Sequence, residues 1–305
     1  MTSFGKIALI GIGLINGSLA RVLKDKGAVT SITACARSEA TRERALELGL
    51  CDRACEDPRA AVEGADIVVL GTPPLAMGEI ARQIGPSLGS RTIVTDVGSM
   101  KARIIADVTP HLPHPELFVP GHPVAGTEHS GPDAAFGTLF IKRRCILTPC
   151  ETTDPQAVET IRAMWEITGA EVDVMAPEHH DQVLAITSHL PHLIAYTIVG
   201  TVDDLEEQAQ TEVFKYAAGG FTDFTRIAGS DPTMWRDVFL GNRDAVLEML
   251  GRFTEDLTAL QRAIRWGEGD KLFDLFTRTR AIRRGVVAAG QAYVRQQDDP
   301  LASKP

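Results

Sequence analysis

The sequence predicts an α/β fold in which a doubly wound parallel sheet is followed by an all-α region. Over the first half of the chain, short apolar runs alternate with helix-length segments, which is typical of parallel βαβ units. A glycine-rich turn follows the first apolar run, as in Rossmann-type dinucleotide-binding domains. Strand-like runs stop near residue 175, and helical patterns continue to about residue 297.

The strands expected in the first half are short apolar runs bounded by turn residues. They lie at Lys6–Ile10, Ile32–Ala36, Ile67–Leu70, Thr92–Val97, Leu117–Val119, Cys145–Thr148 and Glu171–Val174. Helices are expected at Ile15–Lys26, Ala40–Leu48 and Asp154–Thr168. Strands separated by segments of helix length predict parallel pairing through right-handed crossovers.

Beyond Pro177 the pattern becomes helical. Pro177 suits the first turn of a helix, where its missing N–H is not needed. Asp231 and Pro232 predict a second helix start, with the aspartate as N-cap. Pro191 removes one helical hydrogen bond and should kink its helix. The expected domains are a dinucleotide-binding domain at 1–175, a helical substrate and dimerisation domain at 176–297, and a flexible tail at 298–305.

The composition limits the class of partner. The chain has 305 residues and a formal net charge of −9, with both signs interspersed. This argues against nucleic acid as a partner but leaves room for an anionic substrate in a local cationic pocket. Five cysteines without zinc-type spacing fit a reducing cytosol and predict no structural metal. No signal pattern and no apolar run of ~18 residues is found, so we expect a cytoplasmic protein without a membrane span.

The glycine-rich turn is the expected cofactor site. Gly11 and Gly13 allow a tight turn and close approach to a pyrophosphate, and Leu14 and Ile15 open the helix whose free N–H groups face that anion. Asn16 stands where the motif has its third glycine. An ordinary glycine-rich turn is the alternative.

The end of the second strand predicts which cofactor binds. An acidic residue there would bind the ribose hydroxyls of NAD, but this chain has Ala36, Arg37 and Ser38. Arg37 could pair with a 2′-phosphate through two hydrogen bonds, which favours NADP, with NAD possible. The alternative is an Arg37 that is solvated or stacks on adenine.

Further ligand-binding residues are expected at the carboxyl ends of the later strands. Thr72 and Pro73 follow the strand at 67–70, and Ser99 follows the strand at 92–97. Ser99 could reach the nicotinamide or the substrate. A loop-capping role is an equal alternative for each of the three.

Two segments carry a more specific signal. The run Gly121-His122-Pro123-Val124-Ala125-Gly126 and the stretch 219–235 resemble the TyrA family, the prephenate and arogenate dehydrogenases of tyrosine synthesis. The resemblance covers about residues 5 to 290. The family's catalytic base maps onto His122. A histidine suits that role because its unperturbed pKa is ~6.5, close to working pH.

The stretch 219–235 supplies the expected substrate contacts. The family's substrate-binding arginine maps onto Arg226, and a guanidinium grips a carboxylate through two parallel hydrogen bonds. An ordinary ion pair with Asp223 is the alternative. A further alternative is that Asp223 orients local backbone or a neighbouring chain. Gly219 is expected to contact the substrate. Trp235 is expected either to line the pocket for the substrate ring or to pack in the core.

A third set of residues lies on one helix face. His180, Ser188 and His192 recur at spacings of four and eight residues. We expect Ser188 and His192, together with His180, to line the substrate pocket, and His189 to be a core histidine. Hydride transfer to a nicotinamide needs no metal, so a metal site among these histidines is not expected.

The resemblance implies oxidative decarboxylation of prephenate, arogenate or both, with hydride transfer to a nicotinamide, in an interlocked homodimer that tyrosine possibly inhibits. It leaves no room in 305 residues for the regulatory or chorismate mutase domains of some relatives. One alternative is another two-domain dehydrogenase acting on a β-hydroxy acid or imine. Such enzymes use a lysine base, and the chain after Pro177 has no lysine before Lys215. The second alternative is a non-catalytic sensor that binds NADP.

Overall fold

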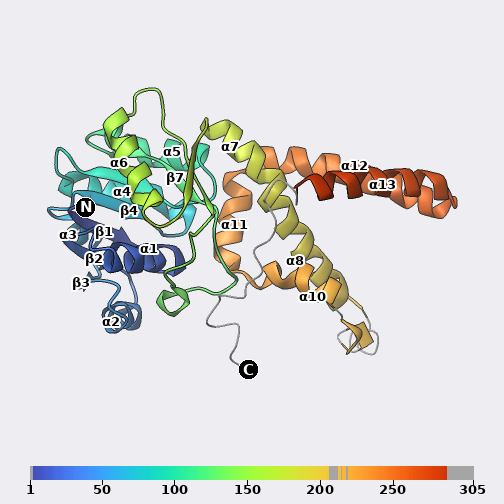
Figure 1. Cartoon of the computed structure of the whole chain (residues 1–305), viewed down its shortest axis with the longest axis horizontal. Coiled ribbons are helices and arrows are strands. Elements are labelled where there is room, and N and C mark those ends of the chain that lie inside the picture. Colours follow the sequence, from blue (N-terminus) through green and yellow to red (C-terminus); the bar gives the residue numbers. More distant parts are fainter. Residues whose placement is uncertain (1–2, 206–211, 214, 218, 287–305) are drawn as a thin grey trace. The chain divides into compact units, whose positions relative to one another are not determined.

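A computed structural model of the chain describes residues 3–205, 212–213, 215–217 and 219–286 (Figure 1). The chain divides into two compact units, Met1–Val246 and Leu247–Pro305. The first unit contains two β-sheets and the helices up to α11. The second contains most of α12 and all of α13.

The main sheet has six parallel strands in the order β3-β2-β1-β4-β5-β6, which is the strand order of Rossmann folds. The fold class predicted from the sequence is confirmed. In this sheet Ile7 of β1 pairs with both Ile32 of β2 and Ile67 of β4. The strands are β1 (Lys6–Ile10), β2 (Ser31–Cys35), β3 (Arg53–Cys55), β4 (Ile67–Leu70), β5 (Ile93–Asp96) and β6 (Phe118–Val119).

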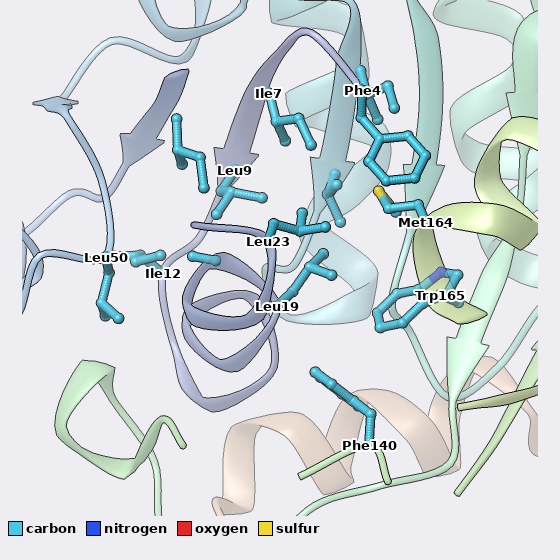
Figure 2. Packing of buried hydrophobic residues seen from close by; sticks show 14 of the residues in the cluster. Phe4, Ile7, Leu9, Ile12, Leu19, Leu23, Leu50, Phe140, Met164 and Trp165 are labelled. Carbon is cyan, nitrogen blue, oxygen red and sulfur yellow. The ribbon is translucent and has the colours of Figure 1, made fainter. Parts of the chain in front are cut away.

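Both faces of this sheet are buried, because successive side chains of a strand point to opposite faces. In β1, Ile7 and Leu9 join one hydrophobic cluster, while Ala8 and Ile10 join another. The first cluster includes side chains of α1 and α6, among them Trp165 (Figure 2). The second includes side chains of α3, α4 and α5. These helices are α1 (Leu14–Asp25), α3 (Pro58–Val62), α4 (Met77–Ile84), α5 (Ala102–Val108) and α6 (Pro155–Glu166).

A second, three-stranded sheet follows β6. It consists of β7 (Gly121–Pro123), β8 (Arg144–Leu147) and β9 (Glu171–Val174), with β7 antiparallel to β8 and β8 parallel to β9. The two later strands predicted from the sequence therefore form their own sheet beside the main one. Neither β3 nor β7 was predicted, since three residues are too few to show a period.

The helical region begins at Pro177, as predicted. α7 (Pro177–Leu184) continues through a π-helical segment, Ala185–His189, into α8 (Leu190–Asp203). The irregularity expected at Pro191 thus takes the form of a wide turn just before it, and widened turns of this kind bend helices. α10 (Gly219–Thr225), a 3₁₀ turn at Arg226–Gly229 and α11 (Pro232–Gly241) follow.

The start of α11 confirms the predicted cap, because the Asp231 side chain accepts a hydrogen bond from Met234 N and Pro232 opens the helix. The last helices are α12 (Arg243–Arg265) and α13 (Gly269–Val286). Within the described part of the chain, Pro177–Asp203 is long and apolar enough to cross a membrane by length and composition alone. Core helices of soluble proteins meet the same criterion, so the expected lack of a membrane span stays a prediction.

Candidate active site

His122 lies in β7 and is the first member of a buried hydrogen-bonded chain. Its Nδ1 atom is 2.8 Å from His180 Nε2. The other ring nitrogen of His180, Nδ1, is 2.8 Å from Asp181 Oδ1. His122 is 7% exposed and His180 is fully buried. The two imidazoles and the carboxylate are thus held in a line that begins on β7 and ends on α7.

Asp181 is itself fixed by the nucleotide-binding half of the chain. Its Oδ1 accepts a hydrogen bond from Lys101 N at 2.7 Å, and its Oδ2 accepts one from Ala102 N at 2.9 Å. These two N–H groups open α5, where a helix has unsatisfied donors and favours a negative charge. The carboxylate therefore connects α7 to the turn that follows β5.

A buried ion pair supports the backbone around His122. Lys101 Nζ contacts Asp96 Oδ2, with both side chains fully buried, and also donates to the carbonyl oxygen of Gly121 at 2.6 Å. The Asp96 carboxylate accepts further hydrogen bonds from Gly98 N and Gly121 N. A buried ion pair is tolerated when such extra hydrogen bonds satisfy both partners. The Lys101–Asp96 pair therefore fixes the backbone of Gly121, next to His122.

The environment keeps these histidines neutral. Burial lowers the pKa of His122 well below its usual value, and His180 and Lys101 lower it further. Burial also lowers the pKa of His180, although the hydrogen bond that His180 donates to Asp181 opposes the shift. A neutral imidazole has a free lone pair on one nitrogen and can accept a proton.

An aromatic cluster surrounds the π-helical segment. The ring of His192 stacks on Trp235, with centroids 3.6 Å apart, and its Nδ1 lies 2.9 Å from the carbonyl oxygen of Ser188. Trp235 is buried, and its Nε1 has no hydrogen-bond partner in the described part of the chain. His189 is fully buried as predicted, 3.1 Å from Asn242 Nδ2. Burial lowers the pKa of both His189 and His192 to about 4.

Arg226 lies at the edge of this cluster, and its positive charge contributes to the lowered pKa of His192. Its Nη1 atom forms an ion pair with Glu128 Oε2 at 2.6 Å, and both side chains are partly exposed. Glu128 was missed by the sequence analysis, although it lies in the loop after His122 that carries the family resemblance. Gly219 and Asp223 lie exposed on α10.

The glycine-rich turn has the shape that a dinucleotide requires. Gly11 has a φ of 88°, and a Cβ on it would lie 2.5 Å from the carbonyl oxygen of Gly71. A Cβ on Gly13 would meet nothing within 4 Å. Gly13 caps α1, whose first N–H groups have no side-chain partner and no acidic neighbour. Open space in front of free N–H groups suits a pyrophosphate.

Asn16, which replaces the third glycine of the motif, braces this turn. Its Nδ2 atom donates to the carbonyl oxygen of Gly11 at 2.8 Å. The packing role falls to the next residue, since a Cβ on Gly17 would lie 2.8 Å from the Cβ of Ala135. The departure from the motif therefore preserves the geometry of the turn.

Comparison with known proteins bears directly on this arrangement. A model of the nucleotide-binding domain of prephenate dehydrogenase matches residues 19–174, and a model of its dimerization domain matches residues 176–278. The chain belongs to the prephenate dehydrogenase family. Two members illustrate the relationship. Cyclohexadienyl dehydrogenase of Zymomonas mobilis is 42% identical over 93% of this chain and 96% of its own length. Prephenate dehydrogenase of Bacillus subtilis is 35% identical over 92% of this chain and 76% of its own.

Solved structures of the prephenate dehydrogenase family agree with the fold. The Aquifex aeolicus enzyme, in complex with hydroxyphenyl propionate and NAD+, is similar with a TM-score of 0.85 and 32% identity, covering 94% of this chain and 98% of that one. Synechocystis arogenate dehydrogenase has a TM-score of 0.75 and 30% identity, covering 92% and 99%. Family membership makes this chain an oxidoreductase.

Three further predicted site residues lie after strands: Thr72 and Pro73, expected to bind the cofactor, and Ser99, expected to take part in catalysis by reaching the nicotinamide or the substrate. Thr72 follows β4, and its hydroxyl is buried without a partner in the described part of the chain. Pro73, next to it, is exposed. Ser99 is half-buried in the turn between β5 and α5, two residues before the Lys101 that pairs with Asp96.

At the end of β2, Arg37 is exposed. Ser38 caps α2 (Glu39–Glu47) by accepting a hydrogen bond from Thr41 N, so its hydroxyl is partly committed to the helix. The sequence analysis missed a second cation here. Arg42 Nη1 donates to the carbonyl oxygens of Ala36 and Arg37, at 2.8 and 2.7 Å. Its position five residues after Arg37, about one turn into α2, was the available signal.

Proposed function

We propose that this chain oxidatively decarboxylates prephenate, arogenate or both, in tyrosine biosynthesis, with hydride transfer to a nicotinamide cofactor. The observation that carries the proposal is the arrangement of His122. Its Nδ1 is committed to His180, its pKa is lowered by burial, and its Nε2 stays available as a proton acceptor. The relatives that bear these names, and the nucleotide-binding turn at Gly11 and Gly13, support the same activity.

His122 acts on the hydroxyl of the substrate ring. Its Nε2 takes the hydroxyl proton as the C–H bond on the same carbon breaks. The nicotinamide, when bound, accepts the hydride. The C–C bond to the ring carboxylate then breaks, its electron pair completes the aromatic ring, and the ring oxygen regains a proton as carbon dioxide leaves. The protein contributes alignment and charge placement more than covalent chemistry.

Arg226 binds a substrate carboxylate. The guanidinium is paired with Glu128 at 2.6 Å, so a carboxylate of the substrate either joins this pair or replaces Glu128 in it. Bidentate pairing gives orientation as well as affinity. Trp235 and His192, which stack on each other, form an apolar wall beside this cation. Ser188 supports the wall through its backbone carbonyl, which contacts His192, and Ser99 faces the cofactor and the ring.

The preferred cofactor is NADP, with NAD as a weaker alternative. Gly11, Gly13, Leu14 and Ile15 hold the pyrophosphate on the first turn of α1. Thr72 and Pro73 border the nicotinamide ribose. Arg37 and Ser38 are the residues assigned to the 2′-phosphate, and Ala36 stands at the strand end in place of the acidic residue that would bind the ribose hydroxyls of NAD. The 2′-phosphate contributes charge-assisted hydrogen bonds, which are stronger than neutral ones.

The protein works as a cytoplasmic homodimer, consistent with the dimerization domain matched at residues 176–278. Asp223, exposed on α10, and Gly219 complete the substrate site with help from the second chain. Tyrosine, which resembles the reaction product, is the candidate inhibitor.

A turnover assay tests the proposal. The purified protein is given prephenate or arogenate with NAD or NADP, and the reduced nicotinamide and the released carbon dioxide are measured together. One molecule of each should appear per substrate, faster with NADP. Binding of NADP without turnover of either substrate would instead favour a sensor. Turnover of a β-hydroxy acid without carbon dioxide release would favour a different dehydrogenase.

A further inference from the structure

We propose that His180 and Asp181 form a positioning relay that holds His122 in the tautomer whose Nε2 accepts the substrate proton. The inference rests on the proposed function and assigns a role to two residues that touch neither substrate nor cofactor. His180 was expected to line the substrate pocket. It is fully buried, and both its ring nitrogens have partners within the protein, so no nitrogen of its ring is left to contact a substrate.

The direction of each hydrogen bond follows from the partners at the far end of the relay. Asp181 accepts hydrogen bonds from Lys101 N and Ala102 N, so its carboxylate oxygens present lone pairs. The facing atom, His180 Nδ1, must therefore carry the hydrogen of that bond. A neutral imidazole has one N–H only. His180 Nε2 is then an acceptor.

The same step applies to the next ring. Since His180 Nε2 accepts, the hydrogen between the two imidazoles belongs to His122 Nδ1. His122 Nε2 is left with its lone pair exposed to the ligand. The reversed arrangement would need a hydrogen on His122 Nε2, and an imidazole in that form cannot act as a base at that atom. Tautomer assignment by network is the accepted route when hydrogens are not observed.

Burial, together with the charge of Lys101, keeps His180 neutral and the relay in this state. A protonated His180 would donate from both nitrogens and force the reversed tautomer on His122. Burial disfavours that cation, and so does the ammonium group of Lys101. Asp181 and Asp96 act in the opposite sense. Burial is the largest influence, and His180 therefore stays neutral at pH 7.

The relay also stabilises the positive charge that forms on His122 when it takes the proton. When His122 takes a proton on Nε2, its ring becomes a cation whose Nδ1–H still points at His180. The lone pair of His180 Nε2 and, behind it, the Asp181 carboxylate stabilise that cation without moving. Groups that are already oriented before the charge forms stabilise it at the least reorganisation cost.

The first test reads the tautomer directly and needs no substrate. The protein is labelled with ¹⁵N in its histidines, and the two ring nitrogens of His122 are assigned by comparison with His122→Asn. At pH 7.5 the wild type should show a protonated Nδ1 and an unprotonated Nε2. A protonated Nε2 would overturn the proposal. This result is independent of turnover, so it separates a failed relay from a failed proposed function.

The second test uses two substitutions at His180, one that keeps a hydrogen-bond acceptor and one that removes it. His180→Gln can place an amide oxygen where Nε2 stood and accept from His122 Nδ1, whereas His180→Phe packs there without any acceptor. The phenylalanine variant should lose kcat by roughly 10²–10⁴-fold, as other misoriented bases do, and its His122 should shift toward the Nε2–H tautomer. The glutamine variant should keep the wild-type tautomer and recover at least ten times the kcat of the phenylalanine variant.

Folding and cofactor binding serve as controls. The dissociation constant for the cofactor should stay within threefold of wild type in both variants. His114→Asn, which alters an exposed histidine paired with Glu116, should change neither kcat nor the His122 resonances. Equal losses of kcat in the glutamine and phenylalanine variants, with an unchanged His122 tautomer, would show that His180 only fills space. If His180→Phe does not fold, the wild-type tautomer and the glutamine variant still decide the question.

Discussion

The proposed base of this site, His122, is a histidine that burial keeps neutral. An ordinary imidazole would be partly protonated near pH 6, whereas burial, His180 and Lys101 all lower the pKa of His122. The cost is a weaker intrinsic base. The gain is that nearly every molecule holds the reactive form at pH 7. Arg226, in contrast, must carry its charge, and it does so at the partly exposed edge of the site.

Replacement of His122 tests the base. His122→Asn keeps a polar side chain but cannot accept the proton, so kcat should fall by roughly 10²–10⁴-fold while cofactor affinity is nearly unchanged. In the wild type, kcat/KM should fall only when the pH drops below 6.5, the usual value from which burial lowers this pKa. A variant that works within threefold of wild type would remove His122 from the mechanism.

Replacement of Arg226 should have a different kinetic signature. Arg226→Ala should mainly raise the KM for substrate. The substrate should lose binding free energy on the order of 2–4 kcal/mol, because the variant removes a partly desolvated partner of the carboxylate. Arg226→Lys keeps the charge without the planar fork and should recover part of the loss. Arg82→Ala removes an exposed arginine paired with Glu79 and should leave KM unchanged. Weakened cofactor binding with normal substrate KM would contradict this assignment.

At the scale of elements, turns and helix ends make the site. The end of β2 and the start of α2 present Arg37, Arg42 and the cap Ser38 together. Arg42 is held by two backbone carbonyls, so its guanidinium is fixed at the edge where the 2′ position of a cofactor would be sensed. Arg37 is exposed and free to turn toward a ligand.

Cofactor choice is predicted to follow from this junction. Charge-assisted hydrogen bonds contribute ~1.5–3 kcal/mol each, so NADP should bind about tenfold to a hundredfold more tightly than NAD. Ala36→Asp with Arg37→Ile should invert the preference by supplying an acceptor for the hydroxyls and repelling the phosphate. Dissociation constants at one modest ionic strength are the measurement, since salt screens the phosphate contact. If the wild type binds NAD more tightly than NADP, and Arg37→Ala does not change this preference, Arg37 is only a solvated side chain.

The sequence predicted elements with a clear pattern and missed those without one. The strands at 67–70 and 171–174 agree with the structure to the residue. The first is an apolar run bounded by turn residues, and the second alternates polar and apolar residues with the period of a strand. β7 was missed because Gly-His-Pro has no strand pattern and pairs only through β8. The partners of His122 were not predictable either. His180 and Asp181 lie 58 and 59 residues further on, and only the packing of α7 against the start of α5 brings them together.

At the scale of the whole molecule, several buried imidazoles make stability depend on pH. For His189 and His192, burial lowers the pKa from 6.5 to about 4 in the folded chain. The folded chain therefore binds fewer protons than the unfolded one between these values, and the unfolding free energy rises with pH across this window. The stabilisation is complete above pH 6.5 and is lost as the pH falls toward 4.

Denaturation at several pH values checks this. His189 alone should contribute about 3 kcal/mol to the loss between pH 7 and pH 4, from 1.36 kcal/mol per pKa unit. His189→Gln keeps an acceptor for Asn242 but does not titrate, so its unfolding free energy should fall less steeply in acid than that of the wild type. Equal slopes for both proteins would show that His189 is not a source of the acid sensitivity.

The second compact unit exposes large apolar side chains in the described part of the chain. Trp266 and Phe273 are 71% and 70% exposed, and Phe276 and Ile282 are also exposed. Such a surface is typical of a protein interface, and the dimerization domain matched at 176–278 includes most of it. Phe273→Asp should therefore weaken or abolish the dimer, as measured by light scattering over a concentration series. Asp274→Asn, on the same helix, should leave it intact.

Asp181 links the helical region of the chain to its nucleotide-binding half. The carboxylate belongs to the helical region, the imidazole it ultimately orients belongs to β7, and the two N–H groups that fix it belong to the nucleotide-binding half. A small shift of α7 away from the start of α5 would break the hydrogen bonds that Lys101 N and Ala102 N donate to Asp181, at the far end of the chain from His122. If His180 and Asp181 act as proposed, the orientation of His122 depends on contact between the helical region and the nucleotide-binding half, so separation of the two should lower kcat even where substrate still binds.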